Sequence, residues 1–432
     1  MSEIIAYIIH FLLNEERLAQ SVGSIIGYTS KKSDFHHYKL VILPSDFFNE
    51  EIYGTNKSSP QLPLSDIEGI PLLFGEPKVE KLGETLILHA DIIASTYFLI
   101  SRYEEIICRD KRDEHGRFSG KESLPFRAGF INRPIVDEYG KLLRKLLREQ
   151  GLNIPEPESK IQKIYLTHDV DRLVHYRNFR SVAGAMLRRR ELKVVLKTCL
   201  DGIEHDPWYT FPWMFKLNRS LQEKTGSGIC ETIVFIKSGG GKQPEDQPIS
   251  NIFNKDFQKF FNFCRDKNVS FGLHPSYRAG EYPELIQQEK CLLEKAIGTQ
   301  IRCSRHHFLR LREPQDTRAL LDTCITDDFT MGYADVAGFR LGTSRSVRWI
   351  DAENRRITAF VLHPLTVMES SLSNERYMGL SEEDAYKHAV QLIDETKKHS
   401  GELTLLWHNT SVEKGVSYQR KLYERLIDYL SK

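Results

Sequence analysis

The sequence lacks the features by which membrane and secreted proteins are recognised. An apolar run at residues 4–13 (IIAYIIHFLL) is far shorter than the about 20 residues that a membrane-spanning helix needs. It contains His10, and neither Lys nor Arg precedes it, whereas a secretory signal begins with a positively charged segment. We therefore expect a cytoplasmic protein without a transmembrane segment, in which this run is a buried element.

Cysteine pairs and an excess of one charge are also missing. The 7 cysteines are irregularly spaced and form no Cys-x-x-Cys pair, which argues against both a disulfide framework and a zinc knuckle. The chain carries 60 basic and 59 acidic residues, for a net charge of +1. Proteins that bind nucleic acids usually present a basic face. The composition therefore predicts no nucleic-acid partner.

The length and one polar segment predict two domains. A chain of 432 residues is too long for one ordinary hydrophobic core. Residues 151–160 (GLNIPEPESK) combine two prolines and a glycine with polar residues, which is typical of a linker. We predict a smaller α/β accessory domain of unknown role at residues 1–155 and a second domain at residues 161–432.

The second domain shows the pattern of an α/β fold. Short β-branched runs alternate with helix-period segments, and strands that are apolar throughout are typical of a parallel sheet covered on both faces. About seven such strands predict a distorted (β/α) barrel. The expected strands are residues 163–170, 232–238, 269–276, 301–308, 325–331, 357–365 and 403–409, and the clearest helices are 256–268, 283–298 and 382–399.

Titratable residues follow several of these strands, where barrel enzymes place their active sites. In THDVD (167–171), Asp169 and Asp171 are two residues apart and face the same side of an extended chain. Two carboxylates that close repel each other unless a cation or a shared proton separates them. A divalent metal ion would relieve this repulsion: one aspartate would bind the ion, and the other would stay free to accept a proton. The alternative is a solvated Asp-x-Asp turn.

Three further strand ends carry candidate site residues. His274 follows the strand that ends in GLHPSY, and a neutral imidazole is a favoured ligand of zinc or nickel, although a histidine bound to the backbone would look the same. In SRHHFLR, Arg305 can pair with a carboxylate, and only one of His306 and His307 can face the site from a strand. His408 ends LLWHN and suits a general acid, because its pKa lies near working pH.

These motifs, in their order along the chain, resemble those of the polysaccharide deacetylases, the NodB-like carbohydrate esterases. The likeness is closest to a bacterial two-domain subgroup from envelope-glycan loci, whose N-terminal domain has no known role, and it extends over essentially the whole chain. Residues 89–105 (HADIIASTYFLISRYEE) and 133–139 (RPIVDEY) resemble that N-terminal domain. The motifs that carry the resemblance are THDVD, GLHPSY, SRHHFLR, DDFTMGYAD and LLWHN.

The resemblance implies a metal-dependent hydrolase that removes N-acetyl groups from a sugar or glycan precursor in surface polysaccharide metabolism. Its partner would be an N-acetylated carbohydrate and its cofactor a divalent metal ion, with zinc as the expected metal. Carried over position by position, the family pattern makes Asp169 the catalytic base and Asp171 and His274 metal ligands. It makes Arg305 the residue that orients the base and His408 the general acid.

One position departs from the family pattern. Arg278 stands where the family has its second ligand histidine, and a guanidinium has no lone pair to give to a metal. We expect Arg278 to turn away and His307 to complete the ligand set. Alternatively, Arg278 fills the place of the ion, and the chain is a non-catalytic glycan-binding or assembly protein. A metal-dependent hydrolase of a small amide is a third interpretation.

Overall fold

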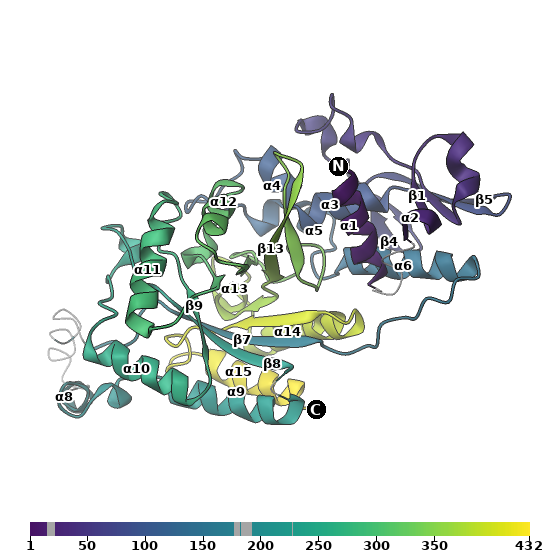
Figure 1. Ribbon diagram of the computed structural model, residues 1–432. Coiled ribbons are helices and arrows are strands. Elements are labelled where there is room, and N and C mark those ends of the chain that lie inside the picture. Colours follow the sequence, from purple (N-terminus) through teal and green to yellow (C-terminus); the bar gives the residue numbers. More distant parts are fainter. Residues whose placement is uncertain (15–21, 177–181, 183–191, 227) are drawn as a thin grey trace. The chain divides into compact units, whose positions relative to one another are not determined.

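The chain forms two compact units (Figure 1). The computed structural model describes residues 1–14, 22–176, 182, 192–226 and 228–432. Within these ranges no helix combines the length and the apolar composition needed to cross a lipid bilayer. Unit 1 consists of Met1–Ile161, Gly338–Pro364 and Asp394–Glu402, and unit 2 consists of Gln162–Ala337, Leu365–Ile393 and Leu403–Lys432.

Unit 1 contains a four-stranded sheet in the order β1-β2-β6-β5. The pairs β1–β2 and β2–β6 are parallel, and the edge strand β5 is antiparallel to β6. Two antiparallel pairs, β3–β4 and β12–β13, also belong to this unit. The strands are β1 (Ile26–Tyr28), β2 (Leu40–Ile42), β3 (Ser65–Ile67), β4 (Ile70–Leu72), β5 (Gly75–Leu82), β6 (Thr85–Ala90), β12 (Val347–Asp351) and β13 (Arg356–Pro364).

Helices α1, α3 and α6 contact one another in the core of unit 1. The apolar run at residues 4–13 lies in α1, whose buried side chains recur at helical spacing, so the expectation of a buried element is confirmed. Helix α3 is buried along its whole length, and the Asp91 carboxylate caps its first turn by accepting from the Ala94 N–H at 2.9 Å. The helices are α1 (Ser2–Leu13), α2 (Val22–Ile25), α3 (Ile92–Ile100), α4 (Tyr103–Ile107), α5 (Leu124–Arg127) and α6 (Ile135–Glu149).

Buried charges attach Gly338–Pro364 to the rest of unit 1. Arg340 donates two hydrogen bonds to the buried Glu105 carboxylate, at 2.8 and 2.7 Å. Burial alone would raise the pKa of Glu105, but the guanidinium outweighs it and holds this pKa below its usual value. The Asp137 carboxylate, also buried, accepts from the Ser344 N–H at 2.8 Å and from the Arg345 guanidinium at 2.9 Å. These carboxylates therefore stay ionised in the core and depend on their partners.

The strands of unit 2 have the order β11-β10-β9-β8-β7-β15-β14, within a curled sheet of nine strands. The pairs from β7 to β11 and the pair β14–β15 are parallel, as the sequence predicts for an α/β fold. The strands are β7 (Lys163–Val170), β8 (Cys230–Ile236), β9 (Ser270–Leu273), β10 (Cys303–Ser304), β11 (Asp327–Met331), β14 (Val367–Met368) and β15 (Glu402–Leu406).

The expected seven-strand barrel is thus only partly correct. The strand expected at 357–365 forms β13, which pairs antiparallel with the unexpected strand β12 instead of following the parallel pattern. The short strand β14 was not expected either, because two residues are too few to show a pattern. The sheet is a half-barrel with nine strands and not a clear barrel of seven.

The helices expected in this part of the chain are present. Residues 256–268, 283–298 and 382–399 correspond to α10, α11 and α14. Helix α9 contacts both β8 and α15 and so covers the sheet near β7 and β8 (Figure 1). The helices are α8 (Leu192–Leu200), α9 (Phe211–Thr225), α10 (Lys255–Asp266), α11 (Leu285–Ile297), α12 (Gln315–Asp322), α13 (Glu369–Ser373), α14 (Glu382–Lys398) and α15 (Gln419–Leu430).

We predict that Arg340→Ala lowers the free energy of unfolding of unit 1 by about 3–5 kcal/mol, because it removes the two guanidinium hydrogen bonds of the buried Glu105 carboxylate. Arg109→Ala is the matched control. It breaks the ion pair with Glu353 in the same unit, where Arg109 is 47% exposed, and should cost about 0–1 kcal/mol. Urea unfolding of the full chain measures both. Equal losses for the two variants would contradict the assignment.

Candidate active site

The side chains of strand β7 alternate between the two faces of the sheet. Thr167 and Asp169 both accept from the same guanidinium nitrogen, Nη1 of Arg305, at 2.7 and 3.0 Å, so they face one side of the strand. His168 faces the other side, where its Nδ1 contacts the Trp407 carbonyl at 2.9 Å and its ring packs against Phe215. Burial lowers the pKa of His168 to about 4, so this histidine is a neutral core residue.

The strand register brings the candidate residues to one edge of the sheet. Val170 of β7 pairs with Ile236 of β8, and Ile236 pairs with Leu273 of β9. Leu273 in turn pairs with Ser304 of β10. All four strands end at this row, and the chain turns away after it. The next residue of each strand therefore lies in one row, which consists of Asp171, Lys237, His274 and Arg305.

Three ligand-type atoms converge beside this row. Oδ1 of Asp171 lies 3.2 Å from Nε2 of His274 and 3.1 Å from Nδ1 of His307. The two imidazole nitrogens are 3.0 Å apart. His274 and His307 are buried, and the Asp171 side chain is partly exposed although its Oδ1 is buried. Burial tends to raise the pKa of Asp171, but when the facing imidazoles of His307 and His274 are protonated, their charge outweighs it and holds this pKa well below its usual range.

Backbone carbonyls determine which nitrogens point inward. Nδ1 of His274 is 2.6 Å from the Arg305 carbonyl, and Nε2 of His307 is 2.9 Å from the Glu245 carbonyl. A carbonyl can only accept, so the N–H of each neutral ring lies on these outer nitrogens. The inner nitrogens then present lone pairs to each other and to a carboxylate. Such an arrangement is repulsive unless a cation, either a metal ion or added protons, lies between them.

This set of atoms fits a zinc-type ion. One carboxylate and two imidazoles are common zinc ligands, and the outer hydrogen bonds to carbonyls are typical of ligating histidines. Two ligands at about 2.0–2.1 Å from a tetrahedral zinc ion are roughly 3.3 Å apart, close to the separations here. Oδ1 of Asp171 is also buried without a hydrogen bond from any described residue. Asp171, His274 and His307 therefore form a candidate metal site.

Asp169 lies beside this group but is held by a different residue. Nη1 of Arg305 donates to its Oδ1 at 3.0 Å, and Nε of Arg305 donates to the Phe329 carbonyl at 3.0 Å. The guanidinium also lies over the Phe235 ring, 4.5 Å from its centroid. The other oxygen, Oδ2, is 3.8 Å from Nε2 of His274. Arg305 thus fixes one oxygen of Asp169 and leaves the other facing the candidate metal site.

Glu369, which sequence reasoning missed, positions His408. Its Oε1 accepts from Nδ1 of His408 at 2.7 Å and from the His408 backbone N–H at 2.9 Å. The other ring nitrogen, Nε2, lies 3.8 Å from Oδ2 of Asp171 and 4.0 Å from Oδ2 of Asp169. Burial favours the neutral ring, but the charges of Glu369, Asp171 and Asp169 outweigh it and raise the pKa of His408 to about 10. His408 is therefore a proton donor aimed at the two aspartates.

Arg278 does not occupy the candidate metal site. Its guanidinium lies over the Tyr282 ring, 5.6 Å from the centroid, and in the described part of the chain it pairs with neither Asp169 nor Asp171. The Asp246 carboxylate accepts from the backbone N–H groups of Tyr277 and Arg278, at 2.8 and 3.1 Å. The backbone of this segment is thereby fixed while the Arg278 side chain extends elsewhere.

His307 reaches the site from a turn and not from a strand. Strand β10 ends at Ser304, and His307 begins a short 3-10 helix. The next two residues, Phe308 and Leu309, have φ values of 61° and 53°, which non-glycine residues rarely adopt. The His307 N–H donates to the Pro275 carbonyl at 3.0 Å, which places the turn beside His274. The expectation of a strand to residue 308 is therefore wrong, because this strained turn replaces it.

Comparison with known proteins adds little to this site. Residues 1–152 match the model of a family of unknown function, DUF7033. None of the curated proteins matches the chain. Among solved structures, the chain is similar to that of a "putative polysaccharide deacetylase" from Mycobacterium smegmatis, with 11% sequence identity and a TM-score of 0.40. The similarity covers 64% of this chain and 86% of that one. A likeness this distant leaves the geometry of the site as the basis for a function.

We predict that Asp171→Ala, His274→Ala and His307→Ala each lose bound zinc, because a site with three protein ligands becomes too weak when one is removed. Asp169→Asn is the control, and its zinc content should stay near that of the wild type. Metal analysis after dialysis against dilute zinc measures all four variants. Full occupancy in any of the three alanine variants would show that the replaced residue is not a ligand.

Proposed function

We propose that the chain is a metal-dependent hydrolase that removes N-acetyl groups from a sugar or glycan precursor of surface polysaccharide metabolism. The observation that supports this most is the convergence of Asp171, His274 and His307 beside a carboxylate, Asp169, that is not part of the cluster. A metal site with a separate carboxylate is what hydrolysis of an amide by water requires. The motif resemblance to the polysaccharide deacetylases supplies the substrate class.

Each residue of the site has a proposed role. Asp171, His274 and His307 hold a divalent ion, with zinc as the expected metal. When bound, such an ion polarises a carbonyl and lowers the pKa of water to about 7. Asp169 accepts the proton of the attacking water on Oδ2, the oxygen that Arg305 leaves free. His408 gives a proton from Nε2 to the departing amine.

The two aspartates are assigned their roles by their neighbours. Oδ1 of Asp171 lies within 3.2 Å of both imidazole nitrogens, whereas Oδ2 of Asp169 is 3.8 Å from Nε2 of His274. Asp169 is instead bound by Arg305, which orients its carboxylate. This asymmetry supports Asp171 as the ligand and Asp169 as the base.

We predict that Asp169→Asn lowers kcat by at least about 100-fold, the usual contribution of a general base. The amide keeps the shape of the side chain but cannot accept the proton, so the zinc content should not change. The assay is acetate release from an N-acetylated amino sugar by the zinc-loaded protein. Loss of zinc in this variant would reverse the roles of Asp169 and Asp171.

Glu369→Ala should lower kcat by about 10–100-fold, with KM and zinc content near wild type, because the His408 ring loses the acceptor that orients it. Glu369→Gln keeps an acceptor oxygen in the same place and should retain more of the activity than the alanine variant. A purely structural role for Glu369 would instead lower the thermal stability of both variants and change KM and kcat together.

The alternative, a non-catalytic glycan-binding or assembly protein, predicts different results. A glycan-binding protein would bind N-acetylated oligosaccharides without releasing acetate, and Asp169→Asn would leave that binding unchanged. Acetate release from a small N-acetylated amide but from no amino sugar would favour the amide hydrolase instead. Substrate screening of the zinc-loaded wild type separates these outcomes from the proposal.

A further inference from the structure

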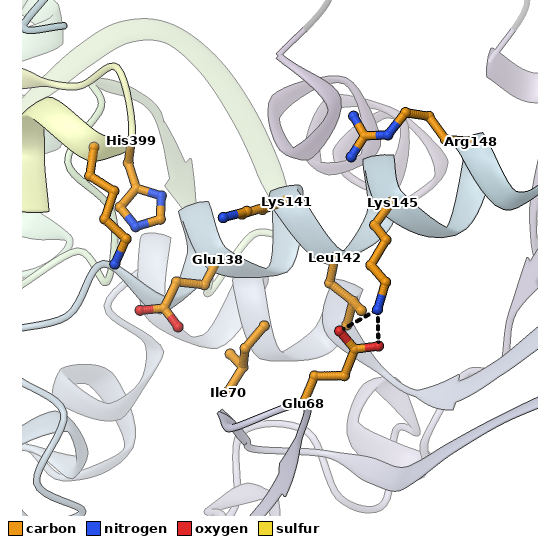
Figure 2. A pocket seen from close by; sticks show the side chains of 9 residues that line it. Glu68, Ile70, Glu138, Lys141, Leu142, Lys145, Arg148 and His399 are labelled. Atoms are coloured by element: carbon orange, nitrogen blue, oxygen red, sulfur yellow. Dashed lines mark hydrogen bonds and ion pairs between the residues drawn. The ribbon is translucent and has the colours of Figure 1, made fainter. Parts of the chain in front are cut away.

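Unit 1 contains a pocket of about 310 Å³ beside helix α6 (Figure 2). Basic side chains dominate its lining, and three of them stand at positions i, i+4 and i+7 of α6, on one face of the helix. Two acidic side chains, Glu68 and Glu138, complete the charged lining. The basic residues are Lys141, Lys145 and Arg148 of α6, together with Lys398 and His399.

The acidic residues of the pocket are already paired. Arg133 donates to both oxygens of the Glu138 carboxylate, at 3.0 and 2.5 Å. Lys145 lies 2.6 and 2.8 Å from the two oxygens of Glu68. Lys141, by contrast, has no hydrogen bond or ion pair with any residue that the structure describes. Arg148 and Lys398 are paired as well, with Glu156 and Glu395, so the uncompensated charge of the lining is that of the exposed Lys141.

His399 contributes an unsatisfied ring nitrogen. Its side chain is 5% exposed, and its Nε2, which lies 3.5 Å from Oε2 of Glu395, is buried without a hydrogen bond from the described residues. Burial lowers the pKa of His399, so the ring is neutral and one of its nitrogens carries a proton. Figure 2 shows the His399 ring and the Lys141 amine pointing into the same space. A buried polar atom without a partner is unfavourable, and a bound ligand would satisfy it.

A cation is a poor occupant of this pocket. Ligand atoms of Glu138, Glu395 and His399 do lie within 4.8 Å of one another. However, Arg133 already binds Glu138, and Lys398 lies 3.0 Å from Glu395. With both carboxylates compensated and Lys141 facing the same space, a divalent cation would be repelled and an anion attracted.

We propose that this pocket binds the phosphate group of a small phosphorylated molecule, with Lys141 and His399 as its main contacts. A phosphate monoester carries about −1.5 to −2 charges at pH 7 and three strong acceptor oxygens, which match an amine and an imidazole donor. The volume lies at the lower end of small-molecule pockets, about 300–1,000 Å³. The site belongs to unit 1 alone and does not depend on the proposed hydrolase activity.

Titration calorimetry of the full chain with inorganic phosphate, at constant ionic strength, tests the proposal. We expect one saturable site in the wild type and an affinity at least about tenfold lower in Lys141→Gln, because a charge-assisted contact is lost. Lys81→Gln is the matched control, since Lys81 lies on the exposed strand β5 and does not line the pocket. Lys141→Arg, which keeps the charge, should bind phosphate nearly as the wild type does.

Three results would overturn the proposal. The first is the absence of saturable phosphate binding to the wild type. The second is equal binding by Lys141→Gln and Lys81→Gln, with melting temperatures equal to that of the wild type. The third is binding of zinc, without phosphate, at a site that survives Asp171→Ala and is lost in Glu395→Gln. Acetate at the same concentration should displace little of the bound phosphate. If acetate binds as tightly as phosphate, the pocket is a carboxylate site and the proposal is wrong.

Discussion

The candidate active site depends on a repulsion that something must relieve. Two imidazole nitrogens and a carboxylate oxygen face one another at 3.0–3.2 Å. The backbone carbonyls of Arg305 and Glu245 keep the ring protons on the outer nitrogens. Arg305 belongs to the site itself, and Glu245 precedes Asp246, which binds the backbone that follows His274, so residues that support the site also set the tautomers of its histidines. A bound cation would convert this repulsion into a source of stability.

Much of the site could be predicted because its chemistry follows strand ends. THDVD and GLHPSY come directly after apolar strands, and parallel strands end at one edge of a sheet, so the proximity of Asp169, Asp171 and His274 follows from local pattern and topology. The sequence named His307 as the third ligand but placed it on a strand, and it did not point to Glu369. His307 instead begins a turn whose next two residues have positive φ, and no residue pattern predicts such a turn. Glu369 lies 39 residues from His408, with no motif to connect them.

The fold was predicted less completely than the site. Alternating strands and helices indicated an α/β protein. The strand expected at 163–170 and the helix expected at 256–268 are present with nearly the expected bounds. The barrel of seven strands was wrong in detail, because the antiparallel strand β13 has the same apolar pattern as a further parallel strand of a barrel. The boundary near residues 151–160 stays a prediction. Sequence pattern is local and cannot show that Gly338–Pro364 belongs to the compact unit formed by the first 161 residues.

The inclusion of Gly338–Pro364 in unit 1 has a consequence for how this unit can evolve. The match to a family of unknown function ends at residue 152, yet Glu105 and Asp137, inside the matched region, are neutralised by Arg340 and Arg345, outside it. A recombination event that moved only residues 1–152 to another gene would leave two ionised carboxylates in an apolar core. In this chain the matched region is therefore not a self-contained module, because two of its buried carboxylates depend on arginines from a distant part of the sequence.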